Sequence, residues 1–138
     1  MRIRPFRRED TEAVVALWQA CGLTRPWNDP YADIEAKLAV QPELFFVGTE
    51  ADGTVVAAVM AGYDGHRGSV NYLAVAPDHR RQGLGAQLMA HAEAALAGLG
   101  CPKINLQVRR ENQAVAGFYQ RLGYEPFDIV DLGKRLDG

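Results

Sequence analysis

A run of nine residues, 55–63, constrains the fold of this 138-residue chain more than any other feature of its sequence. The run is almost entirely apolar and lies between two turn signals, Asp52-Gly53 and the segment 64–68. Its length is typical of a strand, and a strand without polar positions is usually buried on both faces. We therefore expect a central strand in a sheet that is covered on both sides.

Hydrophobic periodicity on either side of this run predicts further strands and helices. Apolar residues at helical spacing follow Asp10, and Asp29-Pro30 is typical of a helix start. The expected fold is α/β, because a hairpin block meets a β-α-β unit and the central sheet is then mixed and flanked by helices. We expect strands at residues 2–6, 44–49, 70–75 and 103–108, one or two more between 124 and 134, and helices at about 11–21, 30–41, 83–98 and 112–122.

The size and composition of the chain fit one folded domain, residues 1–138. A chain of 15.1 kDa buries about two-thirds of its unfolded surface. Its residues are 48% hydrophobic and 23% charged, which excludes a disordered chain. No apolar stretch approaches the roughly 20 residues of a membrane-spanning helix, so we expect no membrane association.

The charge balance and the two cysteines bear on partners and compartment. With 15 basic and 17 acidic residues the net charge is −2, which argues against a nucleic-acid partner. The charged N-terminus lacks the apolar region of a secretory signal, and Cys21 and Cys101 form no CxxC pair. We expect a cytoplasmic protein whose cysteines are buried or incidental. Acidic residues lie close in the sequence to Arg2, Arg4, Arg7 and Arg8. We therefore expect these arginines to lie at a solvated edge of the fold.

The segment 73–86 carries the most specific chemical signal. A strand enters a loop with Arg80 and Arg81, and the glycines Gly83 and Gly85 then open a helix. A helix N-terminus offers unpaired N–H donors and a partial positive charge, and glycine lets an anion approach the backbone closely. The segment therefore predicts a phosphate site, most naturally one for a pyrophosphate.

Three kinds of phosphate-binding loop compete for this segment. A Walker loop needs four residues between its glycines and then Lys-Ser/Thr, and this loop has neither. A dinucleotide fingerprint needs a small residue where Leu88 stands and an acidic residue where Asn105 stands. The remaining pattern, Arg-x-x-Gly-x-Gly from Arg80, resembles motif A of the GNAT N-acetyltransferases, which hold the pyrophosphate of acetyl-CoA.

A second segment strengthens this resemblance. Residues 112–124, which read NQAVAGFYQRLGY, are similar to the second signature of the GNAT family, and the order of elements resembles the family along the whole chain. The segments 24–30 and 62–68 further resemble the bacterial YpeA-like branch. The resemblance implies the GNAT fold, in which the strand at 70–75 splays from the strand at 103–108 and leaves a V-shaped slot for the cofactor.

The resemblance also implies how acetyl-CoA is held. Backbone groups of Leu73, Ala74 and Val75 would meet the pantetheine arm, and the N–H near Val75 would polarise the thioester carbonyl. No metal is implied. The pyrophosphate would lie against Arg80 and Arg81 and the main-chain N–H groups of Gln82, Gly83, Leu84, Gly85 and Ala86.

Two residues of the second segment have both a structural and a functional interpretation. Asn112 is a natural helix cap, and the family places an asparagine here against the pantetheine. Tyr119 lies at helical spacing with Val115 and Leu122, as a core aromatic would. The resemblance instead implies that Tyr119 lies beside the sulfur of CoA, where a phenol could protonate the departing thiolate.

The acceptor site and the general base are less determined by the sequence. Aromatic and acidic residues suited to a cationic amine gather at Trp27, Asp29, Tyr31 and Asp33, and Asp64 is a further substrate-binding candidate. The strand at 70–75 carries no carboxylate that could deprotonate the amine. The alternatives for that step are Asp64, His66, Glu111, or a water relayed through Asn71 or Tyr72.

The resulting expectation is an N-acetyltransferase that moves an acetyl group from acetyl-CoA to a primary amine by direct transfer in a ternary complex. Small molecules and peptides are both open as acceptors, and exposed sheet edges favour a homodimer. The missing carboxylate keeps one alternative open, an acyl-CoA-binding module without turnover. A domain that binds ATP or NAD is the second alternative.

Overall fold

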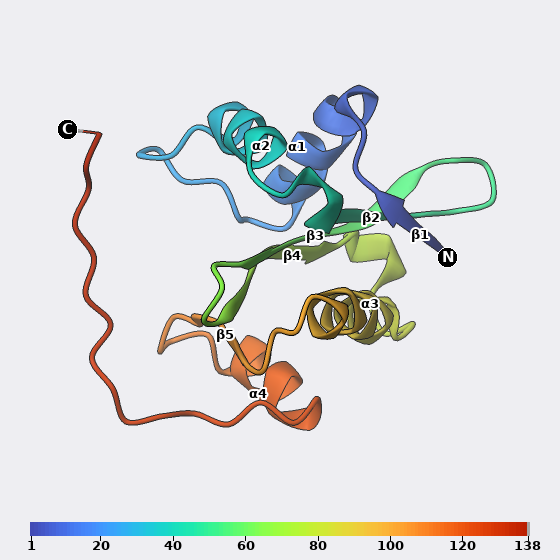
Figure 1. Cartoon of the computed structure of the whole chain (residues 1–138). Coiled ribbons are helices and arrows are strands. Elements are labelled where there is room, and N and C mark those ends of the chain that lie inside the picture. Colours follow the sequence, from blue (N-terminus) through green and yellow to red (C-terminus); the bar gives the residue numbers. More distant parts are fainter. Residues whose placement is uncertain (138) are drawn as a thin grey trace. The chain divides into compact units, whose positions relative to one another are not determined.

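The computed structural model describes residues 1–137 and contains a five-stranded sheet in the order β1-β2-β3-β4-β5. The first four strands are antiparallel and β5 runs parallel to β4 (Figure 1). This is the mixed sheet that the sequence predicts. Its strands are β1 (Arg2–Pro5), β2 (Phe45–Thr49), β3 (Val55–Tyr63), β4 (Gly68–Val75) and β5 (Ile104–Asn105), and the helices are α1 (Thr11–Ala20), α2 (Pro30–Ala39), α3 (Leu84–Gly98) and α4 (Gln113–Arg121).

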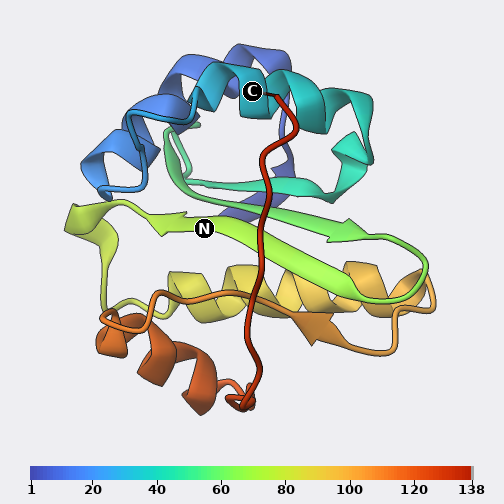
Figure 2. The same ribbon diagram turned by 90° about the vertical axis from the view of Figure 1, so that its left-hand side faces the viewer.

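The chain divides into two compact units, residues 1–106 and the segment from residue 107 onward. In the first unit, α1 and α2 cover one face of the sheet and α3 covers the other (Figures 1 and 2). β3 lies between these helical layers, and its residues from Val56 to Met60 are buried. The prediction of a central strand buried on both faces is therefore confirmed.

A stack of aromatic rings organises the layer between the sheet and α1. The indole of Trp18 on α1 packs on Tyr72 of β4 at a centroid distance of 3.9 Å and on Phe45 of β2 at 6.3 Å. Phe45 also stacks on Phe6, which follows β1, at 4.2 Å. Because parallel rings exclude water over a large area, this stack fixes α1 against β2 and β4 and against the residue that follows β1.

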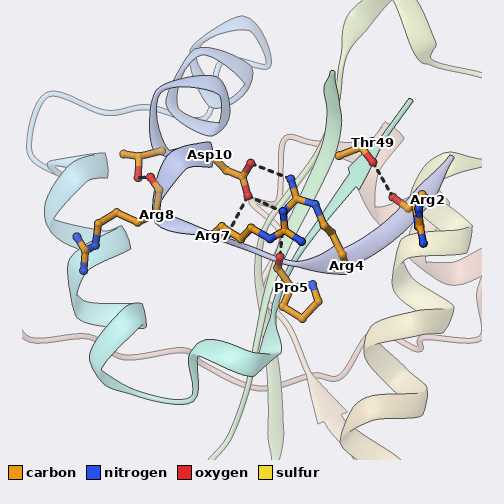
Figure 3. Close-up of polar contacts among 8 residues, drawn as sticks. Arg2, Arg4, Pro5, Arg7, Arg8, Asp10 and Thr49 are labelled. Carbon is orange, nitrogen blue, oxygen red and sulfur yellow. Dashed lines mark hydrogen bonds and ion pairs between the residues drawn. The ribbon is translucent and has the colours of Figure 1, made fainter. Parts of the chain in front are cut away.

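Arg4 and Asp10 form a half-buried ion pair rather than part of a solvated edge. The guanidinium of Arg4 donates to both carboxylate oxygens of Asp10, at 2.7 and 2.9 Å (Figure 3). The backbone N–H of Arg7 donates to the same carboxylate at 2.8 Å. Asp10 stands at the N-cap of α1, but its side chain makes no cap bond there. The solvated-edge prediction is therefore wrong for Arg4, whose partner lies six residues along the chain.

Two predictions about the second half of the chain are also wrong. Residues 122–137 contain no strand or helix, whereas one or two strands were predicted between 124 and 134. A strand forms only where another strand pairs with it, and Ile129, Val130 and Leu132 are exposed. β5 covers two residues instead of six. Cys21 and Cys101 are half-buried free thiols, and that they are buried or incidental stays a prediction.

The Arg4–Asp10 pair generates a stability prediction. Burial acts to raise the pKa of Asp10, but hydrogen bonds from Arg4 and from the Arg7 backbone lower it overall. A carboxyl with a lowered folded pKa stabilises the fold above its unfolded pKa, and this contribution disappears as pH falls through the folded value. Asp10→Asn should therefore lower the free energy of unfolding at pH 7 by about 2 kcal/mol, measured by urea denaturation.

The difference between wild type and Asp10→Asn should shrink as pH falls below about 4, where the carboxyl of the unfolded chain becomes protonated, and should disappear below the lowered pKa of the folded state. Glu35→Gln is the control, because it removes an ion pair with Arg8 whose side chains are both exposed, and such pairs contribute little. Equal stability of Asp10→Asn and wild type at pH 7 would contradict this account.

Candidate active site

The start of α3 presents a set of backbone N–H groups without helical partners. The first bond within the helix runs from Gln87 N–H to the carbonyl of Gly83, at 3.1 Å. The N–H groups of Leu84, Gly85 and Ala86 precede it, no side chain caps the helix, and its first turn holds no acidic residue. These groups and the helix dipole therefore favour a bound anion.

The loop before α3 has the backbone conformation of an anion-binding turn. Arg81 and Gly83 have φ values of 67° and 75°, in the left-handed region that favours glycine. Gly83 is left-handed and the helical residues that follow it are right-handed, a combination that can turn successive N–H groups toward one point. A Cβ on Gly83 would have no atom within 4 Å, so the space outside the turn is open. The exposed side chains of Arg80, Arg81 and Gln82 adjoin this space.

β4 has an edge that β5 covers only at its beginning. The two strands pair at Gly68 with Ile104 and at Ser69 with Asn105, and β4 then continues to Val75 without a partner in β5. The N–H of Ala76 donates to Val56, so the N–H of Val75 points to the opposite edge, away from β3. β4 therefore has an edge beyond Ser69 that β5 does not pair with, which the predicted V-shaped slot requires.

A bulge in β4 separates this open edge from the rest of the strand. Ala58 pairs with Ala74, but Met60 pairs with Asn71, so β4 has one more residue than β3 over this stretch. Tyr72 lies in the bulge with a φ of 56°, a rare value for a residue with a side chain. A bulge redirects side chains and increases the local twist.

The side chain of Tyr72 joins a hydrogen-bonded cluster beneath the helical layer. Its hydroxyl donates to Asp33 of α2 at 2.5 Å and accepts from the side-chain amide of Asn28 at 2.9 Å. Asn28 also donates to Asp33, at 2.5 Å. Burial, followed by the hydrogen bond to Asp33, raises the pKa of Tyr72 to about 12. The phenol therefore keeps its proton at neutral pH and positions Asp33.

A shallow hollow of about 460 Å³, largely open to solvent and called the cavity below, lies beside this cluster. Its volume lies within the range of sites for small ligands. One of its charged residues is Lys37, whose ammonium donates to the carbonyl of Ala61 at 2.5 Å and whose pKa is lowered by burial. The cavity is lined by Asp33, Ala36, Lys37 and Val40 of α2 and by Met60, Asn71 and Tyr72 of the sheet.

The residues predicted to bind the acceptor lie in different places. Trp27 and Tyr31 are exposed and do not line the cavity, and the hydroxyl of Tyr31 donates to Glu12. Asp64 is exposed and accepts hydrogen bonds from the N–H groups of His66 and Arg67, so its carboxylate closes its own turn. These backbone bonds lower the pKa of Asp64.

Of the acidic residues noted near the helices, Asp33 is the one that lines the cavity, whereas the carboxylate of Asp29 caps α2 through Tyr31 N–H. Lys37 was not anticipated as a site residue. Its spacing of four residues from Asp33 places both on one side of a helix, and this signal could have identified it.

The second unit holds the other predicted cofactor residues. Asn112 caps α4, accepting a hydrogen bond from Val115 N–H at 3.4 Å, which confirms its structural interpretation. Tyr119 lies two turns further along α4, is 8% exposed, and packs edge to face against Phe118 and Tyr124. Burial raises the pKa of Tyr119 to about 12, so its hydroxyl is a proton donor at neutral pH. Glu111, a candidate base, is exposed at the start of this helix.

Comparisons with known proteins agree on one family. The sequence matches the acetyltransferase (GNAT) family over residues 11–124. It is 54% identical to an acetyltransferase of Pectobacterium atrosepticum and 53% identical to an uncharacterised N-acetyltransferase of Yersinia pestis. Both alignments cover 99% of this chain and 96% of the relative.

Two solved structures resemble the fold. Ard1 from Thermoplasma volcanium has a TM-score of 0.79 at 28% identity, covering 88% of this chain and 80% of that protein. A GCN5-related N-acetyltransferase from Ralstonia eutropha has a TM-score of 0.70 at 26% identity, covering 99% of each chain.

Residues 1–137 contain neither a candidate metal site nor a helix able to span a membrane. No group of three or more His, Cys, Asp or Glu side chains in this range is arranged to hold a metal ion. No helix in the same range has both the length and the apolar character needed to cross a bilayer.

Proposed function

Because this chain belongs to the acetyltransferase (GNAT) family and is an acyltransferase, we propose that it moves an acetyl group from acetyl-CoA to a primary amine by direct transfer in a ternary complex. The observation that carries the proposal is the uncapped start of α3, which follows the open edge of β4 in the same unit. Acetyl-CoA has both an anionic pyrophosphate and an arm of amides that could use these two features.

The described residues fit this cosubstrate. The N–H groups of residues 82–86 and the arginines Arg80 and Arg81 would bind the pyrophosphate, since they supply donors and positive charge without a competing carboxylate. The unpaired edge of Leu73, Ala74 and Val75 would bind the pantetheine arm as an added strand. Asn112 would add a side-chain contact to the same arm.

Acetyl-CoA supplies an activated acyl group, and residues of this chain would promote its transfer. The N–H of Val75 would donate to the carbonyl oxygen of the thioester as negative charge develops there. The amine would lose a proton and form the new C–N bond while the C–S bond breaks. Tyr119 would give its phenolic proton to the thiolate. Its raised pKa keeps the phenol protonated at neutral pH but also makes it a weaker acid, so its proposed role rests on its position in the second signature segment.

Among the alternatives for the base, the structure supports some less than others. The Asp64 carboxylate accepts two backbone bonds within its turn, and the phenol of Tyr72 already donates to Asp33. Asn71 lines the cavity and could hold a water molecule there. We therefore propose that the amine loses its proton to water in the cavity, close to the carboxylate of Asp33.

One alternative function remains, an acyl-CoA-binding module without turnover. The observation that favours it is the absence of Asp and Glu from β4, residues Gly68–Val75. Release of free CoA in the presence of peptides, polyamines and small amines distinguishes the two. A cytoplasmic location and a homodimer stay predictions, the first supported by two free thiols.

The phosphate site yields a direct test. Gly83→Glu should lower the affinity for acetyl-CoA by more than about 100-fold, because it places a negative charge where the pyrophosphate binds and strains a backbone at φ 75°. Isothermal calorimetry measures the affinity, and circular dichroism reports whether the variant is folded.

Gly53→Glu is the matched control for that test. Gly53 also has a positive φ, 89°, and also has no atom within 4 Å of an added Cβ, but it lies in the turn between β2 and β3. This variant should suffer the same backbone strain and keep its affinity for acetyl-CoA. Wild-type affinity in Gly83→Glu would refute the proposed phosphate site.

The acid role of Tyr119 has its own test. Tyr119→Phe should lower kcat by about 100-fold, the lower end of the range for general acid catalysis, with little change in the affinity for acetyl-CoA. Release of CoA with the best acceptor of an amine panel measures kcat. Tyr124→Phe, which removes a phenol from a ring packed on Tyr119, is the control and should keep its activity. Normal turnover by Tyr119→Phe would exclude this role.

A further inference from the structure

The cavity beside β4 contains two opposite charges that do not neutralise each other. Asp33 and Lys37 lie one helical turn apart on α2, a spacing at which an acid and a base commonly pair. Here their charged groups are directed to different partners. Asp33 accepts from Tyr72 and Asn28, whereas Lys37 donates to the carbonyl of Ala61. No ion pair joins Asp33 and Lys37 among the described residues.

Both groups keep capacity to bind a ligand. An ammonium has three N–H donors and a carboxylate has two acceptor oxygens. The bonds described for Lys37 use one donor, and both bonds to Asp33 end on the same oxygen, Oδ2. Burial lowers the pKa of Lys37, and the charge of Glu43 offsets this only in part. A ligand that brings an anionic group to Lys37 would stabilise its charge further.

The two charges follow a definite order along the sheet. Asp33 bonds to Tyr72, three residues before Val75 on β4. Lys37 bonds to Ala61, which pairs with Val70, two residues further from Val75 than Tyr72 is. Two strand positions correspond to roughly 7 Å. The negative group of the cavity is therefore nearer to the open edge of β4, and the positive group is further away.

From this order we infer that the acceptor is a small zwitterionic amine, such as a free amino acid. Its ammonium binds Asp33, on the side of the proposed acetyl position, and its carboxylate binds Lys37. The apolar side chains of Ala36, Val40 and Met60 contact the rest of the molecule. This inference rests on the proposed acetyl transfer. It adds that the enzyme selects its acceptor by the acceptor's anionic group.

The test compares free amino acids with their C-terminal amides, which keep the amine and lose the negative charge. Wild type should acetylate the acids with a kcat/KM at least about tenfold above that of the amides, as expected for a charge-assisted bond. Lys37→Gln should remove this preference by lowering kcat/KM for the acids and leaving the amides nearly unchanged. Asp33→Asn should lower kcat/KM for acids and amides alike.

Lys103→Gln is the matched control, since Lys103 is an exposed lysine that precedes β5 and does not line the cavity. It should keep the wild-type preference. Thermal melting identifies variants that fail to fold, and Lys37→Met provides a second neutral side chain at this position. Equal rates for acids and amides in wild type, or an unchanged preference in both Lys37 variants, would overturn the inference.

A binding measurement separates this inference from the proposed function. Calorimetry of the CoA-loaded protein with the same amino acids and amides requires no turnover. If no amine releases CoA, the proposed acetyl transfer fails, and the inference about the acceptor fails with it. If transfer occurs, weaker binding of acids to Lys37→Gln supports the inference, and unchanged binding contradicts it.

Discussion

The extra residue in β4 is the constraint on which the site depends. Before the bulge, β4 pairs with β3 on one edge and with β5 on the other, whereas beyond it β3 is its only strand partner among residues 1–137. The bulge also places Tyr72 against Trp18 and Asp33, so the helical layer is attached to β4 where the strand changes course. The free edge and the cavity are therefore parts of one strand, and both depend on its irregular register.

The charged groups that could bind ligands lie in two local regions, which the net charge of the whole chain does not reveal. A net charge of −2 gives no indication of a polyanionic ligand, yet the start of α3 combines unpaired N–H groups with Arg80 and Arg81 and has no acid in its first turn. The cavity under α2 instead holds Asp33 and Lys37, each directed to partners of its own. One region suits a phosphate ester and the other suits a molecule with two opposite charges, which is consistent with an enzyme that binds two substrates.

Features that depend on neighbouring residues in the sequence were predictable, and features that depend on distant partners were not. The apolar run of β3, the Asp29 and Asn112 caps and the glycine at the start of α3 each have a local signal. The left-handed Tyr72 has none, because the sequence at that position is typical of a regular strand. Asp10 was predicted as a cap, but Arg4 holds its carboxylate instead. The apolar residues near Ile129 predicted a strand and have no strand partner among residues 1–137.

The central claim is that the open edge of β4 and the start of α3 bind acetyl-CoA. The most direct test follows backbone amide resonances by NMR while acetyl-CoA is added to ¹⁵N-labelled protein. The account predicts large shifts for Val75 and for residues 82–86, with smaller ones for the cavity residues Ala36 and Val40. Shifts confined to the cavity, or equal shifts with ATP in place of acetyl-CoA, would contradict it.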